Sequence, residues 1–362
     1  MLEFLTLKPE IFGLDISDLS LKIIKLKKRR KGLDLASIGE VEIKPGIIKE
    51  GEIKKEEDLV KILRESPAQV KGQVLKTKYV IASLPEEKAF LQVIKMPRMP
   101  EEDLKSAVVY EAENYIPLPI EGVYLDSQIV PPVDHLKELE VLIAALPKKI
   151  VDSYVSCIKK AGFQLVSLEI ESLAIARALV KDEFSTSPLL LIDLGATRTS
   201  FIVFSGRSVR FTSSIPVSNQ IFTEIIAKTL NTNLAEAEKL KITRGLERKM
   251  GKREVFEALV PALTDLTQQI KRCIGYYQTH ASFEHLPADG KEISKVLLCG
   301  GGANLKGLPE LLSSELKIPV EIGNPWINIL PEFKKEKSKL SLETSLSYTT
   351  AFGLALRGVE IK

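Results

Sequence analysis

The sequence has few of the residues that mark metal-binding, disulfide-linked or membrane proteins. Its 362 residues include 3 cysteines and 3 histidines, too few and too scattered for a disulfide framework or a metal site built from soft ligands. No apolar run approaches the ~20 residues that a membrane span needs, and the start, MLEFLTLKPE, does not resemble a signal peptide. A net charge of +3 gives no argument for nucleic acid as a partner. We therefore expect a cytoplasmic protein.

What the sequence does contain is an internal repeat. A chain of 362 residues is longer than one core usually supports, so two lobes are expected. Residues 12–26, FGLDISDLSLKIIKL, and residues 190–204, LLIDLGATRTSFIVF, both read as a strand, an aspartate, a tight turn and a second strand. A repeat spaced by half the chain predicts a duplicated fold whose two equivalent turns face each other across a cleft.

Short strands and helices follow one another around both copies. Apolar or alternating runs predict strands at residues 11–48 (as a meander), 78–85, 89–97, 141–147 and 295–298. Helical periodicity predicts helices at residues 56–66, 99–117, 147–162, 167–184, about 258–283 and 345–358. Mixed elements of this kind are typical of an α/β protein.

Two aspartates suggest the chemistry. Asp15 ends the first strand of one copy and Asp193 that of the other. Main-chain N–H groups in tight turns hold phosphates, and Mg²⁺ is bound by carboxylates, often through water. Because an aspartate before a hairpin is also an ordinary turn residue, it is the duplication that favours a phosphate site.

A glycine-rich element follows the strand at residues 295–298. In CGGGANLKGL, residues 299–308, three glycines would allow a flat ligand such as adenine to approach the main chain. The alternative explanation is a strand-to-helix turn in which the glycines serve packing. The element is neither a P-loop nor a Rossmann fingerprint.

The order of these elements resembles that of a known superfamily. Asp15 to Lys22, DLGATRT and GGGANLKGL, with EIESLAIARAL between the first two, resemble the phosphate, adenosine and connecting-helix motifs of the actin-like ATPases. The stretches MPEEDLKSAVVYEAENYIPLP, VDSYVSCIKKAGF and IPVEIGNPW are similar to the PilM family of type IV pilus assembly. The resemblance covers residues 11–358. It implies an α/β, duplicated actin-like (ribonuclease H-like) two-lobed fold with an inserted FtsA-type α+β subdomain.

The resemblance also implies domain boundaries. The expected parts are a first lobe at 1–85, completed by 168–186 and the C-terminal helix 340–362; an inserted FtsA-like subdomain at 86–167; and a second lobe at 187–339, with a small subdomain around 228–262.

ATP and Mg²⁺ are the cofactors that the resemblance implies. The metal pair would be Asp15 and Asp193. The residues around the nucleotide would be Asp18, Leu19, Ser20 and Lys22 in the first hairpin, Gly195, Ala196, Thr197 and Thr199 in the second, Glu238 and Lys241 beside the ribose and adenine, and Gly300, Gly301, Gly302 and Asn304 on the nucleoside. A charge pair three residues apart, such as Glu238 and Lys241, is equally explained as a solvated helix face.

Glu171 begins the connecting helix, where the resemblance implies a catalytic residue that orients an attacking water. A glutamate in a helix's first turn is also favoured by the helix dipole alone. Slow ATP hydrolysis therefore stays open beside nucleotide binding without turnover. Two alternatives also stay open, an FtsA-like filament-forming ATPase and an actin-fold small-molecule kinase.

The inserted segment is the expected partner site. PilM proteins bind the N-terminal cytoplasmic peptide of the inner-membrane protein PilN beside this subdomain. On the helix from Glu101, the residues Leu104, Val108, Glu111 and Tyr115 share one face and are candidates for a peptide groove. The same pattern also fits a core helix with a glutamate at its rim.

The resemblance implies an ATP-binding assembly scaffold of the type IV pilus platform, in which nucleotide closes the cleft and changes the surface offered to PilN. The chain ends in ALRGVEIK, without an amphipathic membrane-targeting helix, so peripheral membrane association should come through the partner. We expect a cytoplasmic protein at the inner face of the inner membrane, with a homo-oligomer or filament as an open alternative.

Three departures from the family pattern concern the turns. Ser218 and Asn219 stand where relatives commonly have two glycines, and Ser17 stands where they have one. Asp18 stands where relatives have serine. A carboxylate there would repel phosphate unless it points away or joins the magnesium shell.

Overall fold

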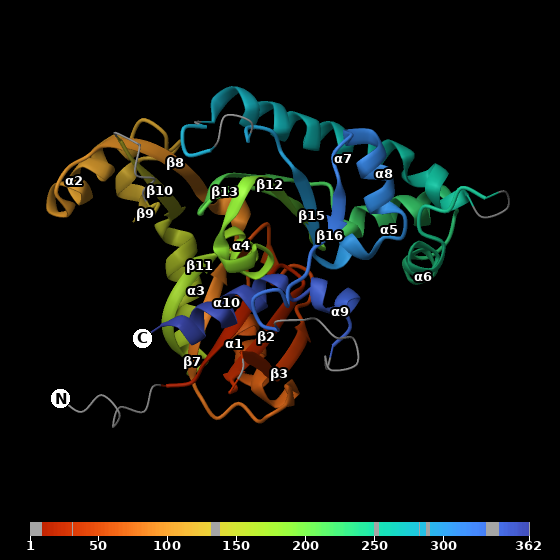
Figure 1. The fold of residues 1–362 in the computed structure, drawn as a ribbon. Coiled ribbons are helices and arrows are strands. Elements are labelled where there is room, and N and C mark those ends of the chain that lie inside the picture. The colour runs from red at the N-terminus through yellow and green to blue at the C-terminus, as the bar shows by residue number, and fades with distance from the viewer. Residues whose placement is uncertain are drawn as a thin grey trace.

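Two sheets and the helices that cover them form the framework of the molecule (Figure 1). The computed structural model describes residues 9–30, 32–131, 138–249, 253–281, 283–286, 290–330 and 340–361. The first sheet contains β1 (Ile11–Ile16), β2 (Ser20–Lys28), β3 (Leu33–Glu42), β6 (Lys71–Gly72), β7 (Tyr79–Leu84) and β11 (Gln164–Ile170). The second contains β8 (Phe90–Pro97), β9 (Val123–Ile129), β10 (Glu138–Pro147), β12 (Ser185–Leu194), β13 (Thr199–Gly206), β14 (Ser208–Ile215), β15 (Lys295–Cys299) and β16 (Val320–Ile322).

A two-stranded hairpin and the helices complete the described elements. The hairpin is β4 (Ile48–Lys49) and β5 (Glu52–Ile53). The helices are α1 (Glu56–Glu65), α2 (Glu101–Ala112), α3 (Lys148–Lys160), α4 (Glu171–Leu179), α5 (Asn219–Thr229), α6 (Leu234–Arg244), α7 (Glu254–His280), α8 (Leu308–Leu316), α9 (Leu342–Leu346) and α10 (Thr349–Glu360). Across the described ranges, none of them is both long and apolar enough to cross a bilayer.

The two sheets have the same core topology, which confirms the predicted duplication. Strand order is β11-β7-β1-β2-β3 in the first sheet and β16-β15-β12-β13-β14 in the second. In each copy the aspartate-bearing strand is antiparallel to the next strand and parallel to a later one. Asp15 is paired with Lys22, and Asp193 with Ser200. The two hairpin turns are therefore equivalent, and the predicted two-lobed α/β fold is present.

The segment predicted as one helix at residues 167–184 is divided. Residues up to Ile170 belong to β11, which runs parallel to β7 on the first sheet, and the helix α4 starts only at Glu171. The prediction of a helix at 167–170 was wrong, because pairing with β7 satisfies the main-chain groups of this short run and the sequence alone does not show that partner.

The inserted segment divides between the two lobes. Strands β8, β9 and β10 extend the second sheet through one register pair, Phe211 with Gln92. The following α3 and β11 return to the first lobe, where α3 packs on α1 and β11 pairs with β7. Figure 1 shows β8 to β10 and α2 projecting at one end of the molecule, and α5 and α6 at the other.

A buried ionic cluster fastens the projecting strands to the second lobe. Arg210 on β14 donates to Glu140 on β10 at 2.7 Å, and both side chains are 6% exposed. His285 lies 3.5 Å from the same carboxylate. Burial alone would raise the pKa of Glu140, but His285 and Arg210 together lower it to about 2. The carboxylate therefore stays ionised and paired where β10 meets β14.

Helices α4 and α10 lie between the two sheets (Figure 1) and approach each other closely. Gly353 of α10 faces the main chain of Ala174 of α4, and a Cβ at that position would clash with the Ala174 carbonyl. On another side of α10, Gly13 of β1 lies against the backbone of Ala351 and Ala355. The absence of two Cβ atoms thus sets the spacing at the junction of the lobes.

Candidate functional site

The two equivalent hairpins line one cavity of about 350 Å³. The structure brings to it these residues predicted from the sequence: Asp15, Asp18, Leu19, Ser20, Lys22, Glu171, Asp193, Gly195, Ala196, Thr197, Gly300 and Gly301. The beginning of α10 and the end of α9 close one side through Leu346, Ser347, Thr349 and Thr350.

Asp15 and Asp193 end their strands inside this cavity with few polar partners. The Ser83 hydroxyl donates to Asp15 Oδ1 at 3.1 Å, and Cys299 Sγ lies 3.8 Å from Asp193 Oδ1. Burial raises the pKa of Asp15, and Lys22 offsets part of that shift. Burial and the neighbouring Asp15 raise the pKa of Asp193 to about 6. The two carboxyl groups repel each other, which is the arrangement that a shared cation would relieve.

Gly300 allows the second aspartate to sit at the turn. Its φ is 80°, a conformation that L side chains rarely adopt, and a Cβ there would clash with Asp193 Oδ1 and the Leu194 backbone. The first glycine of GGGANLKGL therefore makes room for a carboxylate.

The cavity is lined by more acidic than basic side chains. Its acidic lining residues are Asp15, Asp18, Glu40, Glu87, Glu171 and Asp193, and its basic lining residues are Lys22 and Arg198. Burial, then Asp15 and Glu87, raise the pKa of Glu171 well above its ordinary value. No group of three or more ligating side chains arranged for a metal occurs within the described ranges, so a cation here would need water or ligand oxygens to complete its shell.

Glu171 is also part of the helix start. Its Oε2 accepts the Glu86 N–H at 3.3 Å, and Glu86 in return accepts the Ser172 N–H at 3.1 Å. Glu86 is buried, and burial raises its pKa. The pair therefore ties the N-terminus of α4 to the start of the inserted segment beside the cavity.

The side chain of Asp18 is held by the protein. Both of its oxygens accept hydrogen bonds from the turn of the β4–β5 hairpin, at 2.9 Å from Glu50 N–H and 3.0 Å from Gly51 N–H. Both turn residues have positive φ, which aims their N–H groups at one point. The expected repulsion of phosphate is therefore reduced, because this carboxylate already has two main-chain donors.

The structure explains why a serine stands at position 218, where relatives commonly have glycine. Its hydroxyl caps α5 by accepting the Ile221 N–H at 3.3 Å. Asn219, the first residue of α5, donates its N–H to the Gly195 carbonyl at 3.1 Å and lines the cavity. The helix is thus anchored on the second hairpin.

Five residues predicted to contact nucleotide lie outside the cavity lining. Thr199 is buried and donates to the Val217 carbonyl at 2.7 Å. A Cβ on Gly302 would clash with Leu194, so this glycine serves packing. Asn304 donates to the Glu343 carbonyl at 2.9 Å.

The other two, Glu238 and Lys241, pair with each other at 2.7 Å. Lys241 is 4% exposed and also donates to the Asn219 carbonyl at 3.0 Å and to Thr223 Oγ1 at 2.6 Å. Burial lowers the pKa of Lys241, partly offset by Glu238. The lysine therefore joins α6 to α5, next to the residue that lines the cavity.

Several lining residues were missed in the sequence. Arg198 stands inside the turn DLGATRT and could have been found there. Glu87 and Tyr154 come from the start of the inserted segment and from α3. Nothing local connects these two to a phosphate turn, because they reach the cavity only through the tertiary fold.

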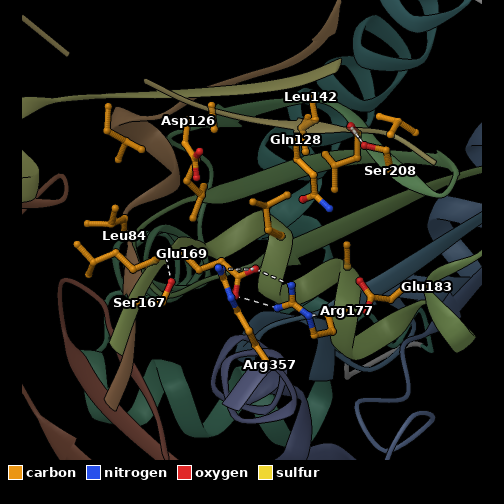
Figure 2. A pocket seen from close by; sticks show the side chains of 18 of the residues that line it. Leu84, Asp126, Gln128, Leu142, Ser167, Glu169, Arg177, Glu183, Ser208 and Arg357 are labelled. Carbon is orange, nitrogen blue, oxygen red and sulfur yellow. Dashed lines mark hydrogen bonds and ion pairs between the residues drawn. The ribbon is translucent and has the colours of Figure 1, made fainter. Parts of the chain in front are cut away.

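A second cavity, of about 580 Å³, is larger than the first, and Figure 2 shows the side chains that line it. Asp126 and Gln128 of β9 lie across it from Glu169 of β11 and Arg177 of α4. Arg177 holds Glu169 through two hydrogen bonds of 2.7 and 2.8 Å, and Arg357 of α10 lies 3.4 Å from the same carboxylate. Apolar side chains from both lobes and the inserted strands complete its walls: Leu84, Leu125, Val130, Leu142, Leu146, Val151, Leu173 and Phe204.

The residues predicted for a peptide groove on α2 do not form one. Leu104 and Val108 are 5% and 1% exposed and pack in the core of the projecting strands. Glu111 is half-buried and Tyr115 is 39% exposed. The shared helical face is therefore a core face with a glutamate at its rim, and the cavity lies on the other side of β9 and β10 from this core.

The duplicated sheets, with aspartate hairpins facing one cavity, define the actin-like class of two-lobed α/β proteins. Within that class the chain belongs to the type IV pilus assembly protein PilM family, whose model matches residues 13–359. A solved structure of a PilM–PilN type IV pilus biogenesis complex is 28% identical and superposes with a TM-score of 0.81, covering 97% of this chain and 99% of that one.

More distant relatives support the same class. MreB5 of Spiroplasma citri bound to AMPPNP is 13% identical with a TM-score of 0.57 and covers 98% of both chains, which shows the fold. FtsA of Borreliella burgdorferi is 26% identical over 250 residues, which are 62% of this chain and 60% of that protein. FtsA of Pseudomonas aeruginosa is 21% identical over 225 residues, 56% of this chain and 50% of that protein. The chain spans about half to three fifths of these curated relatives.

Proposed function

We propose that this protein is a cytoplasmic, ATP-binding assembly scaffold of the type IV pilus platform at the inner membrane. Nucleotide would occupy the cavity between the hairpins, and the N-terminal peptide of PilN would occupy the larger cavity. The observation that carries the proposal is that the two cavities share one wall, so that a ligand in either changes the surroundings of the other.

The charge of the first cavity supports a nucleotide bound together with Mg²⁺. A triphosphate alone would meet an excess of carboxylates, whereas Mg²⁺ supplies positive charge between its phosphates and Asp15 and Asp193. The fit is favoured by the hairpin turns: within the described residues, the N–H groups of Asp18, Leu19, Ala196 and Thr197 donate to no other residue. Such N–H groups are suitable phosphate donors. Glu171 is the candidate for orienting water, and we propose slow hydrolysis at most because Glu86 already occupies one of its oxygens.

The geometry of the second cavity supports an extended peptide as its ligand. In the described sheets, β9 pairs only with β10 and β11 only with β7, so both are edge strands, and both line the cavity. An edge strand can accept an added strand through main-chain hydrogen bonds, while side-chain pockets give specificity. The apolar walls and the Arg177, Arg357 and Arg207 side chains would receive apolar and acidic groups of that peptide.

The shared wall consists of neighbouring residues that face opposite ways. Leu84 lines the peptide cavity and Pro85 the nucleotide cavity. Ile170 and Glu171 divide in the same way, and on α3 Val151 and Tyr154 do so one turn apart. Tyr154 also donates to the Gly51 carbonyl at 3.2 Å, within the turn that holds Asp18. Closure around a nucleotide would therefore move the residues of the shared wall, and with them the lining of the peptide cavity.

A matched pair of substitutions on β9 tests the location of the peptide. Gln128 faces the cavity and its neighbour Ser127 faces the other side of the sheet. We expect Gln128→Trp to weaken binding of the synthetic PilN N-terminal peptide roughly tenfold or more, because the indole fills the groove. Ser127→Trp should bind like wild type in the same calorimetric titration. Equal affinities for the two variants would contradict this location.

A further inference from the structure

Arg198 is the cation of the nucleotide cavity whose donors are uncommitted. The other cation, Lys22, donates to Ser20 Oγ at 3.0 Å, lies 4.0 Å from Glu40 and sits 6.0 Å from the centre of the Tyr348 ring. Among the described residues, Arg198 forms one ion pair, with Glu87 at 3.8 Å, which is too long for a hydrogen bond. No hydrogen bond from its guanidinium to a described residue is formed.

Glu87 is a poorly matched partner for this arginine. Its side chain is 9% exposed, against 24% for Arg198. Burial raises the pKa of Glu87, Arg198 lowers it in part, and the nearby Asp18 raises it again. The pair crosses between the lobes, since Glu87 starts the inserted segment beside Gly51 and Arg198 ends the second hairpin turn. At 3.8 Å this ion pair makes no hydrogen bond, so the guanidinium donors are available to another anion.

The position of Arg198 identifies the anion. A Cβ on Gly301 would meet nothing closer than Ser347 Cβ, at 4.0 Å, so this glycine leaves open space where a nucleoside would rest. Asn219 donates its N–H to Gly195, in the turn that ends at Arg198. Phosphates extending from there would reach the two hairpin turns. Arg198 lies between these turns, because it ends the second one and its neighbour Glu87 lies beside Gly51, whose N–H holds Asp18 of the first. A guanidinium offers a planar fork of N–H donors that matches phosphate oxygens, which a lysine does not.

We propose that Arg198 binds the terminal phosphate of a nucleoside triphosphate and is held by Glu87 when that phosphate is absent. The inference rests on the proposed function and deepens it, since it assigns to one residue the discrimination between triphosphate and diphosphate. Release of Glu87 by the arginine would also transmit the state of the nucleotide to the start of the inserted segment, which directly follows Leu84 in the wall of the peptide cavity.

The test is calorimetric titration of the full chain with Mg²⁺–AMPPNP and with Mg²⁺–ADP. Arg198→Met should weaken AMPPNP binding roughly 10- to 100-fold, as expected for the loss of hydrogen bonds to a charged group, and change ADP binding less than about threefold. Arg198→Lys keeps the charge without the fork and should lie between. Glu87→Gln should tighten AMPPNP binding about threefold or more, because the competing anion is removed.

Arg272→Met, an exposed change on α7 of the same lobe, is the matched control and should bind both nucleotides like wild type. Thermal unfolding of each variant checks that the fold is kept. An equal loss of both nucleotides in Arg198→Met, or no loss, would overturn the terminal-phosphate assignment and leave the proposed function standing. Failure of the wild type to bind either nucleotide would overturn the proposed function and this inference with it.

Discussion

Replacing Gly353 by alanine is expected to destabilise the protein by about 3 kcal/mol or more. The new Cβ would clash with the Ala174 carbonyl and with its neighbouring main-chain atoms. Main-chain atoms cannot avoid the clash by changing rotamer, as a flexible side chain can. Helices α4 and α10 would therefore have to separate at the junction of the two lobes. Thermal unfolding should show a melting temperature lowered by roughly 5 °C or more.

Gly275 provides the matched control for this substitution. It also lies inside a long helix, α7, but a Cβ there meets nothing within 4 Å. Gly275→Ala should therefore stabilise the protein by about 0.5 to 1 kcal/mol through helix propensity. If Gly353→Ala were as stable as Gly275→Ala, the close contact between α4 and α10 would not exist in solution.

Asp193→Asn is expected to weaken Mg²⁺–AMPPNP binding roughly 100-fold or more. Two unit charges 4 Å apart, at an effective dielectric constant of about 20, interact by about 4 kcal/mol, and the double charge of Mg²⁺ about doubles this before desolvation offsets part of it. The amide keeps the size of the side chain and removes the charge that opposes Asp15. We therefore expect the nucleotide-free variant to be at least as stable as wild type, although its affinity falls.

The combination of outcomes separates ligand binding from folding. Calorimetry measures the affinity, and a thermal scan without ligand measures the stability. Asp265→Asn, on the exposed face of α7, is the control and should change neither. Unchanged nucleotide affinity in Asp193→Asn would show that Asp193 holds no cation.

The duplicated hairpins could be predicted from the sequence because their signals are local. A strand, an aspartate and a tight turn occupy a few consecutive residues in each copy, so the pattern survives without tertiary information. Asp15, Lys22, Asp193 and Gly300, which lie near strand ends next to these turns, line one cavity.

Features that depend on distant contacts could not be predicted. Residues 167–170 carry a pattern that fits either helix or strand, and only the presence of β7 decides it. Leu104 and Val108 share a helical face that fits either a core or a groove, and β8 and β10 cover it. Glu238 and Lys241 pair with each other, and Lys241 donates to Asn219 of α5 instead of lining the cavity. The sequence does not reveal that α5 lies beside α6.

The most direct test of the account measures the affinity of the PilN peptide with and without saturating Mg²⁺–AMPPNP, using the full chain in a calorimeter. Because the two cavities share one wall, we predict that nucleotide changes the peptide affinity at least fivefold and that peptide changes the nucleotide affinity by the same factor. Binding of both ligands with no change in either affinity would contradict a nucleotide-controlled scaffold.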